Sequence, residues 1–75
     1  MDGYTEFITA LGKRIKESRK EAGMSQKALA DLIDVTDRAV MNYEHGWRCM
    51  SVWTLVHVCK SLGISADRLL GLDGE

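Results

Sequence analysis

The sequence predicts an all-α fold of five helices. Glycines and hydroxyl-bearing residues alternate along the chain as signals that end and begin helices, and apolar residues between them recur at helical spacing. No segment shows the strict polar and apolar alternation of a half-buried strand. The chain also contains no proline, no low-complexity stretch and no long linker. These observations together describe one helical unit.

The first helix is expected over about residues 5–22. Thr5 can accept hydrogen bonds from the free amides at its start, and Gly23 can end it because glycine tolerates left-handed backbone geometry. Apolar residues recur between these two signals at Ile8, Leu11, Ile15 and Ala22. We expect these four side chains to face the core.

Two short helices are expected at about residues 25–33 and 36–45. Ser25 and Thr36 supply the capping oxygens, and Gly46 closes the second of the two. The inward-facing residues are expected at Leu29, Leu32 and Ile33 in the first and at Val40 and Tyr43 in the second.

Two more helices complete the prediction, at about residues 51–62 and 65–71. Ser51 and Ser65 can cap them, and Gly63 ends the first. Their buried side is expected to carry Leu55, Val58, Cys59 and Leu62, followed by Leu69 and Leu70. The leucines up to Leu72 can also leave an exposed fringe that serves as a dimer surface.

Length and composition limit the classes of protein. A chain of 75 residues predicts a single domain, and no apolar run approaches the roughly 18 residues that span a bilayer. The first residues lack the basic and apolar segments of a signal peptide, so a cytoplasmic protein is expected. Cys49 and Cys59 should then stay reduced, and their spacing is no zinc signature.

Charge is unevenly distributed along the chain. The net charge of −1 argues mildly against an indiscriminate nucleic-acid binder, which usually carries a basic excess. Residues 13–20 nevertheless set five basic side chains against Glu17: Lys13, Arg14, Lys16, Arg19 and Lys20. The end of the chain is acidic, with Asp67, Asp73 and Glu75. An electrically polarised domain is expected.

No catalytic or metal-binding constellation is predicted. His45 and His57 have no carboxylate or cysteine partners at catalytic or ligand spacing, so both are interpreted as ordinary helix residues. The sequence accordingly indicates no enzyme, no cofactor, no metal and no small-molecule ligand.

Residues 26–45 carry the most specific pattern in the chain. Two short helices joined by a tight turn, with a small residue where they approach closely, describe a helix-turn-helix. Ala30 is that small residue. The apolar positions that would lock the two helices together and dock them are Leu29, Val35, Val40 and Tyr43.

The chain resembles the phage-repressor family of helix-turn-helix proteins, of the Cro, lambda-repressor or XRE type. The resemblance covers roughly residues 11–72 and rests on motifs that occur in the family's order. They are Leu11-Gly12-Lys13-Arg14-Ile15, Arg19-Lys20-Glu21-Ala22-Gly23-Met24-Ser25-Gln26, Leu29-Ala30, Val40, Tyr43-Glu44-His45-Gly46, Ser51-x-x-Thr54-Leu55 and Leu62-Gly63-Ile64-Ser65. The resemblance implies a compact five-helix, lambda-repressor-like domain that binds double-stranded DNA.

The resemblance also implies which side chains read bases. In the family, the start of the third helix lies in the major groove, which places Asp37, Arg38, Met41 and Asn42 there. Arg38 suits a guanine edge and Asn42 an adenine edge, while Met41 can touch a thymine methyl group. Asp37 is less suited, because phosphates repel a carboxylate unless it accepts a hydrogen bond from cytosine, and it can instead favour the helix N-terminus.

Contacts to phosphate are implied at the start of the second helix and elsewhere. The candidates are Ser25, Gln26, Lys27, Arg14 and Arg48. Such contacts position the protein without reading sequence. Arg19 and Glu44 stand where the family commonly pairs an arginine with a glutamate, and this pair is expected to hold the third helix at its docking angle.

Three residues depart from the family pattern. Asp34 stands where the turn often has glycine, but aspartate can still adopt left-handed geometry. Met50 replaces a usual proline, which removes one rigid constraint before Ser51. Trp47 replaces a polar or basic residue, and packing on the DNA backbone, on the core edge or on a second copy all stay open.

Two functions are compatible with the sequence. One is a transcriptional regulator, expected to be a repressor, that pairs as a homodimer on a two-fold related operator; single modules of this kind can also be monomeric in solution. The other is a protein-interaction module that kept the fold without operator binding. Salt distinguishes them, since DNA binding weakens steeply as phosphate counterions return.

Overall fold

A computed structural model describes residues 2–73 of the chain. Within these residues there are five α-helices and no strand, which confirms the predicted all-α fold. The helices are α1 (Gly3–Glu21), α2 (Gln26–Ile33), α3 (Asp37–Glu44), α4 (Val52–Leu62) and α5 (Ala66–Leu70). Of the three acidic residues expected near the end, Glu75 lies outside the described residues.

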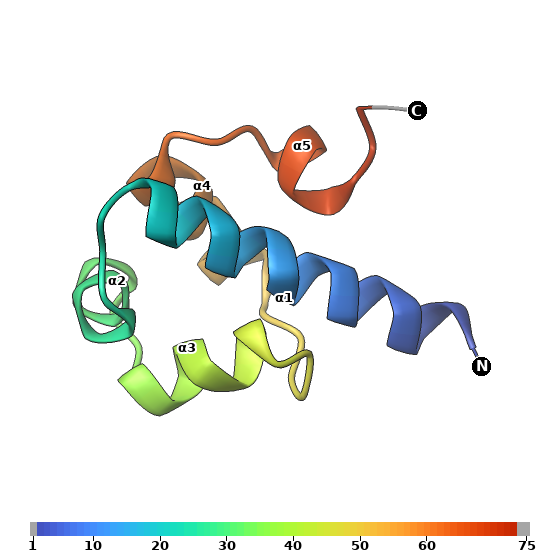
Figure 1. Ribbon diagram of the computed structural model, residues 1–75, viewed down its shortest axis with the longest axis horizontal. Helices are drawn as coiled ribbons and strands as arrows, with labels where there is room; N and C mark the ends of the chain where they lie inside the picture. Colours follow the sequence, from blue (N-terminus) through green and yellow to red (C-terminus); the bar gives the residue numbers. More distant parts are fainter. Residues whose placement is uncertain (1, 74–75) are drawn as a thin grey trace.

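The long helix α1 separates two sides of the molecule (Figure 1). Helices α2 and α3 lie on one side of it, and α5 lies on the other. Helix α4 packs between α2 and α5 and contacts both. None of the described helices combines the length and the apolar character that crossing a bilayer requires.

Four of the helices begin as the capping signals predict. Ser25, Thr36, Ser51 and Ser65 each hold an extended backbone conformation and accept a hydrogen bond from the amide three residues further on. Each bond satisfies one of the donors that the first turn of a helix leaves unpaired. The polar residue that precedes each apolar stripe therefore fixes where these helices start.

The predicted start of the first helix was wrong. Helix α1 begins at Gly3, and its N-cap is Asp2, whose carboxylate accepts a hydrogen bond from the Thr5 amide at 2.7 Å. Thr5 thus lies inside the first turn as the donor partner rather than the cap. This hydrogen bond lowers the pKa of the Asp2 carboxyl group below its usual value, because it favours the ionised form.

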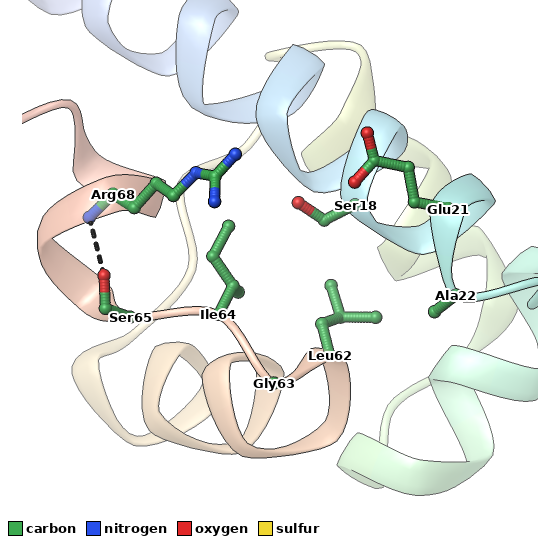
Figure 2. Close-up of a pocket in the computed structure, with 8 residues that line it drawn as sticks. All are labelled: Ser18, Glu21, Ala22, Leu62, Gly63, Ile64, Ser65 and Arg68. Atoms are coloured by element: carbon green, nitrogen blue, oxygen red, sulfur yellow. Dashed lines mark hydrogen bonds between the residues drawn. The ribbon is translucent and has the colours of Figure 1, made fainter.

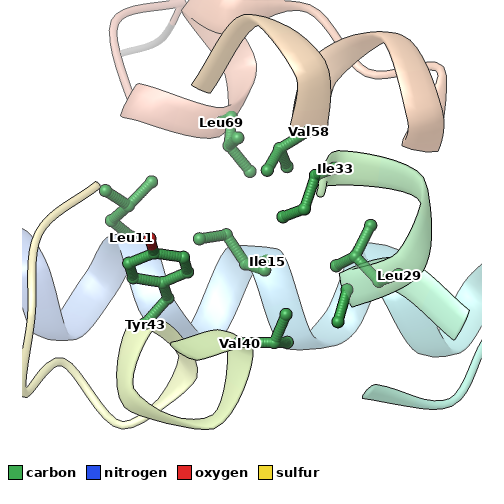
Figure 3. Close-up of a cluster of buried hydrophobic side chains, with 9 residues drawn as sticks. Leu11, Ile15, Leu29, Ile33, Val40, Tyr43, Val58 and Leu69 are labelled. Atoms are coloured by element: carbon green, nitrogen blue, oxygen red, sulfur yellow. The ribbon is translucent and has the colours of Figure 1, made fainter. Parts of the chain in front are cut away.

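The core lies where α1, α2, α3, α4 and α5 face one another (Figure 3). Ile15, Leu29, Val40, Val58 and Leu69 are its fully buried side chains. The predicted inward-facing positions in the third, fourth and fifth helices are all buried or partly buried. Leu72, in contrast, is exposed.

Two predicted core residues are exposed instead. Ala22 follows the last residue of α1 as its C-cap and faces solvent. Leu32 has 56% of its surface exposed. Successive helical residues are rotated by about 100°, so the centre of the stripe formed by Leu29, Ala30 and Ile33 lies about a quarter turn or more away from Leu32. An eight-residue helix has only one narrow face against the core, and Leu32 is outside it.

Helices α1 and α3 approach one another closely at Gly12. A Cβ atom added there would lie 2.5 Å from the carbonyl oxygen of Tyr43 and 2.6 Å from that of Glu44. These distances are well inside van der Waals contact, so only glycine allows this approach. The position of the last turn of α3 therefore depends on the absence of a side chain on α1.

Candidate nucleic-acid interface

Helices α2 and α3 form a compact helix-turn-helix. Ala30 is almost completely buried at their contact, and its carbonyl oxygen accepts a hydrogen bond from the Val35 amide at 3.0 Å. Asp34 adopts left-handed geometry with φ of 60° and φ/ψ values typical of a helix C-cap. The expectation that aspartate can replace glycine in this turn is thus confirmed.

The four predicted base-reading residues share one side of α3. Asp37 and Arg38 are exposed, and Met41 and Asn42, one turn later, are half-buried. Val40 and Tyr43, from the other side of the helix, are buried in the core. Because residues four apart stack along a helix, the structure presents the set Asp37, Arg38, Met41 and Asn42 as one continuous face.

Asp37 has a local partner in this structure. It is the first residue of α3, and its Oδ1 atom accepts a hydrogen bond from the Arg38 amide at 3.0 Å. A carboxylate in the first turn also interacts favourably with the helix dipole. Together with Gln26, Arg38 and Met41, Asp37 lines a shallow hollow between the starts of α2 and α3.

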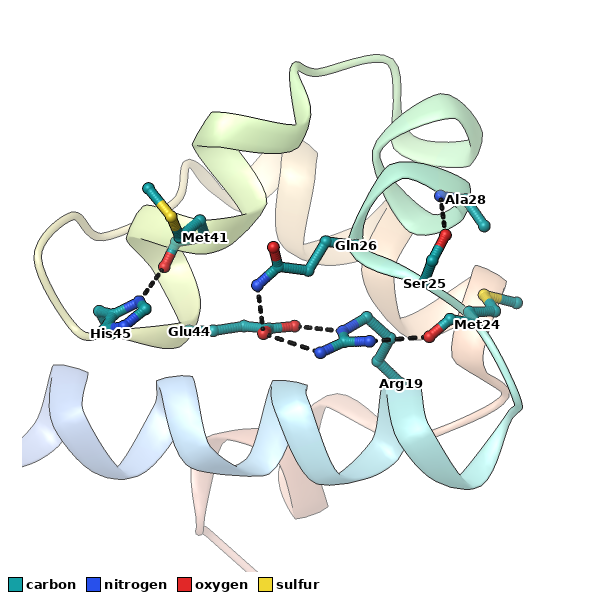
Figure 4. Close-up of polar contacts among 8 residues, drawn as sticks. All are labelled: Arg19, Met24, Ser25, Gln26, Ala28, Met41, Glu44 and His45. Atoms are coloured by element: carbon teal, nitrogen blue, oxygen red, sulfur yellow. Dashed lines mark hydrogen bonds and ion pairs between the residues drawn. The ribbon is translucent and has the colours of Figure 1, made fainter.

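A buried ion pair connects α3 to α1 (Figure 4). Arg19 donates two hydrogen bonds to the carboxylate of Glu44, from Nε to Oε2 at 2.5 Å and from Nη2 to Oε1 at 3.1 Å. Its Nη1 atom donates to the Met24 carbonyl oxygen at 2.7 Å, just before α2 begins. Both side chains are less than one tenth exposed. The pair thus holds the ends of α1 and α3 and the start of α2 in one arrangement.

Gln26 belongs to the same network. Its Nε2 atom donates a hydrogen bond to Oε1 of Glu44 at 3.0 Å, and its carbonyl oxygen lies on the other side of the amide (Figure 4). This bond could not be predicted from the sequence, because it joins residues 18 positions apart on two helices. One amide hydrogen of Gln26 remains to donate to a phosphate.

The other two candidates at the start of α2 are exposed. The Ser25 hydroxyl oxygen accepts a hydrogen bond from the Ala28 amide at 3.0 Å and so is engaged as the cap. Lys27 forms an ion pair with Asp31 one turn later, with 3.7 Å between Nζ and Oδ1. The side chains of Lys27 and Asp31 are largely in solvent, where such ion pairs contribute little stability and exchange readily. Lys27 is therefore free to bind a phosphate.

Arg14 lies apart from the residues at the start of α2, and its predicted contact with phosphate stays a prediction. Gly12 faces α3, and two residues further along a helix the direction has turned by about 200°. Arg14 accordingly lies against α5, where its Nη1 atom donates to the Leu69 carbonyl oxygen at 3.4 Å and its guanidinium covers Gly71. These contacts link the middle of α1 to the end of α5.

The loop after α3 places Arg48 in solvent beside an aromatic pair. Trp47 is 68% exposed and its ring stacks on that of His45, with 4.3 Å between ring centroids and 23° between planes. The Nδ1 atom of His45 also lies 2.9 Å from the Met41 carbonyl oxygen. His45, interpreted from the sequence as an ordinary helix residue, is the C-cap of α3, and its ring is the one on which Trp47 packs. Gly46, between the two, has left-handed backbone geometry with φ of 73°.

A second hollow lies on the side of α1 that faces α5 (Figure 2). It is lined by Ser18, Glu21, Ala22, Leu62, Gly63, Ile64, Ser65 and Arg68. The hydrogen bond drawn within it joins the Arg68 amide to the Ser65 hydroxyl and is only the cap of α5.

Among the described residues, no three His, Cys, Asp or Glu side chains lie close enough to hold a metal ion.

Comparisons with known proteins agree with this geometry. The sequence profile described as "Helix-turn-helix domain" matches residues 12–75. The HTH-type transcriptional regulator ImmR of Bacillus subtilis is 38% identical over 64 residues, which are 85% of this chain and 50% of ImmR. An uncharacterised HTH-type transcriptional regulator of Rickettsia conorii is 35% identical over 57 residues, 76% of this chain and 46% of that protein. The chain thus spans about half the length of these two relatives.

Two solved structures share the fold over nearly their whole length. The restriction-modification controller protein C.AhdI of Aeromonas hydrophila superposes with a TM-score of 0.78 and 29% identity, covering 83% of this chain and 94% of C.AhdI. The P22 c2 repressor, solved in complex with a synthetic operator, gives a TM-score of 0.79 and 30% identity, covering 84% of this chain and 96% of the repressor chain. The resemblance to phage repressors is confirmed by these matches.

Proposed function

The chain belongs to the helix-turn-helix family, and on this premise we propose that it is a sequence-specific transcriptional regulator that binds double-stranded DNA. The observation that carries the proposal is the exposed face of α3, where Asp37, Arg38, Met41 and Asn42 project from a helix that is fixed on its other side. A single helix with such a face fits the major groove of B-form DNA.

The side chains on this face have the chemistry for reading bases. Arg38 can donate two hydrogen bonds to the O6 and N7 atoms of guanine, and Asn42 can pair with the N6 and N7 atoms of adenine. Met41 offers an apolar contact for a thymine methyl group. Asp37, whose carboxylate accepts from the Arg38 amide, keeps a second oxygen that can accept from a cytosine amino group.

Phosphate contacts are proposed on both sides of this face. Ser25, Gln26 and Lys27 present the first turn of α2, where free amides and the helix dipole favour an anion. Arg48 supplies a cation from the loop after α3. Arg14 is a further candidate on the side of α1 that faces α5, where its Nη1 atom donates to the Leu69 carbonyl oxygen.

Two further parts of the proposal concern how the regulator works. The P22 c2 protein is a repressor, and we assign the same direction of regulation to this chain. A single face of this size reads few base pairs, so we propose that two copies bind as a homodimer to half-sites about one helical turn apart. We place this DNA-binding regulator in the cytoplasm.

The test is selection of binding sites from a random duplex library, followed by titration of the selected duplex. We expect an inverted repeat, and we expect Arg38→Ala and Asn42→Ala each to weaken binding by about 1–3 kcal/mol while relaxing the preference at one base position. Arg68→Ala is the matched control, because Arg68 is an exposed arginine on α5, and it should bind like the wild type.

Salt and the outcome of selection separate the two candidate functions. Binding to the selected duplex should weaken steeply between 50 and 200 mM salt, with a slope that becomes shallower by about one unit when Arg48 is replaced by alanine. If no motif is enriched and no duplex is bound at low salt, the operator proposal fails. The acidic Asp37 on the exposed face would then favour the alternative, a protein-interaction module with a basic partner.

A further inference from the structure

The side chain of Gln26 is held in place by a buried charge. Its Nε2 atom donates a hydrogen bond to Oε1 of Glu44 at 3.0 Å. The Glu44 carboxylate is buried and accepts two further hydrogen bonds from the guanidinium of Arg19. A hydrogen bond to an ionised carboxylate is charge-assisted and stronger than one between neutral groups. The position of the Gln26 amide is therefore set by residues on α1 and α3.

The same bond decides which way round the amide lies. An ionised carboxylate can only accept hydrogen bonds, so the nitrogen of the Gln26 amide must face Glu44. A half-turn of the amide would lose this bond and would bring the carbonyl oxygen of Gln26 against a negative charge. The carbonyl oxygen accordingly points away from Glu44, as Figure 4 shows. It is a hydrogen-bond acceptor with a fixed direction.

This acceptor belongs to the hollow that opens between the starts of α2 and α3. Gln26 lines the hollow together with Asp37, Arg38 and Met41. No group within residues 2–73 donates a hydrogen bond to the carbonyl oxygen of Gln26. Asp37 supplies a second acceptor, because the Arg38 amide occupies only its Oδ1 atom. Two acceptors suit a ligand that donates a hydrogen bond, whereas phosphate oxygens can only accept one.

We propose that Gln26 reads a base, by accepting a hydrogen bond from the exocyclic amino group of a cytosine or an adenine in the major groove. The inference rests on the proposed function, and it adds a base-reading residue from α2 to the face of α3. The donors that base edges present in the major groove are the N4 amino group of cytosine and the N6 amino group of adenine. A fixed acceptor therefore distinguishes these two bases from guanine and thymine, which present acceptors there.

The proposed contact is compatible with the other contacts of this region. The second hydrogen on Nε2 of Gln26 can still donate to a phosphate, because base reading uses the carbonyl oxygen. Gln26 and Arg38 line the same hollow, and Arg38 suits a guanine. The amino group that Gln26 reads should therefore lie in the same base pair as that guanine or in an adjacent one.

The orientation of the amide can be measured without DNA. Gln26 and Asn42 carry the two side-chain amide groups of the sequence, so the NMR spectrum of these groups contains two pairs of signals to assign. One hydrogen of Gln26 should exchange with solvent at least about fivefold more slowly than either hydrogen of Asn42, because the Gln26 amide is bonded to Glu44. Equal exchange rates would overturn the inference, since the amide would then not be held.

A cycle that combines one substitution with one altered base tests the contact itself. In the selected duplex, the amino group near the Arg38 guanine is removed by replacing cytosine with pyrimidinone or adenine with purine. At one position this change should weaken binding of the wild type about tenfold, and Gln26→Met should weaken binding of the unaltered duplex to a similar extent. The two changes together should cost less than about twofold beyond either alone. The altered base that gives this result distinguishes cytosine from adenine.

Lys27→Met is the matched control, because it makes the same substitution at a neighbouring residue that is proposed to contact phosphate. Its loss should multiply with the loss from every altered base. Methionine has nearly the length of glutamine and is a good helix former, so circular dichroism should show that Gln26→Met keeps the fold. If the losses of Gln26→Met multiply as those of Lys27→Met do, Gln26 contacts only phosphate and the inference fails, while the proposed function stands.

Two other outcomes would also overturn the inference. If Gln26→Met shows its coupling with 7-deazaguanine at the Arg38 guanine instead, the carbonyl oxygen orients Arg38 and does not read an amino group. The proposed function again stands in that case. If the wild type binds no duplex at low salt, the proposed function fails, and base reading by Gln26 fails with it.

Discussion

Gly12 allows α1 and α3 to approach one another closely, because the carbonyl oxygens of Tyr43 and Glu44 occupy the space of its missing side chain. Both obstructing atoms belong to the backbone of α3, which cannot swing aside as the end of a flexible side chain can. The absence of a Cβ atom at position 12 of α1 therefore decides where the last turn of α3 lies, and with it the direction of the face proposed to read bases.

Gly12→Ala should destabilise the protein by at least about 1–3 kcal/mol, the usual cost of overpacking a core. The free energy of unfolding in urea measures this loss. Gly3→Ala is the control: no atom lies within 4 Å of its added Cβ, and alanine favours helices, so that variant should be unchanged or slightly more stable. Equal stability of the two variants would show that α3 can shift to accommodate the methyl group.

The two cysteines differ in environment and should differ in reactivity. Cys49 is exposed, while Cys59 is half-buried, and burial raises the pKa of the Cys59 thiol because it disfavours the thiolate. At pH 8 a disulfide reagent should label one thiol per chain rapidly and the other much more slowly. Cys49→Ser should abolish the fast phase, and Cys59→Ser should abolish the slow one. Loss of the slow phase in Cys49→Ser would contradict this assignment.

At the scale of the elements, the turn between α2 and α3 has a left-handed aspartate. Asp34 is the one non-glycine residue with positive φ among the described residues. An L-amino acid costs roughly 1–2 kcal/mol in this geometry, whereas glycine adopts it freely. The helix-turn-helix therefore includes a small local strain that its two packed helices overcome.

Asp34→Gly should stabilise the protein by about 1 kcal/mol, visible as a higher midpoint of thermal unfolding. Gly63→Ala provides the reverse experiment. Gly63 ends α4 with φ of 65° and has no atom within 4 Å of an added Cβ, so only backbone geometry opposes the substitution. We expect a loss of about 1 kcal/mol there. A destabilising Asp34→Gly would mean that the aspartate side chain stabilises the turn by more than the backbone strain costs.

Local signals predicted most of the elements because they act within one turn of helix. Four serine or threonine caps set where α2 to α5 begin, and Gly46 and Gly63 set where α3 and α4 end, almost to the residue. Thr5 was the wrong cap for α1, since Asp2 accepts from the Thr5 amide and the helix already includes Gly3 and Tyr4. Leu32 was misplaced because a short helix with several apolar residues does not reveal which of them face the core.

At the scale of the whole molecule, α1 makes different contacts on its two sides. Its side toward α2 and α3 includes the ion pair that orients the proposed interface, and its other side anchors α5 through Arg14. The motif order along the chain predicted which residues lie on the face of α3. It did not predict the direction of Arg14 or the bond from Gln26 to Glu44, since both depend on how distant helices are rotated against each other.

The Arg19 and Glu44 pair joins α1, α3 and the start of α2, and its removal should lower the free energy of unfolding. Replacing one partner leaves the other charge buried and unpaired, which typically costs about 3–5 kcal/mol. We expect losses of that size for Arg19→Met and Glu44→Gln. Arg19→Lys keeps the charge but cannot donate the same two-pronged pair of hydrogen bonds, so its loss should be smaller.

The double variant Arg19→Met with Glu44→Gln shows whether the two groups act as a pair. Its loss in free energy of unfolding should be well below the sum of the two single losses, because neither charge is then left without its partner. Urea unfolding at low temperature, where the single variants keep a measurable folded fraction, gives all four corners of the cycle. Losses that simply add would show that Arg19 acts chiefly through the Met24 carbonyl and Glu44 through Gln26. In that case the start of α2, rather than the contact between α1 and α3, would be what these two residues hold in place.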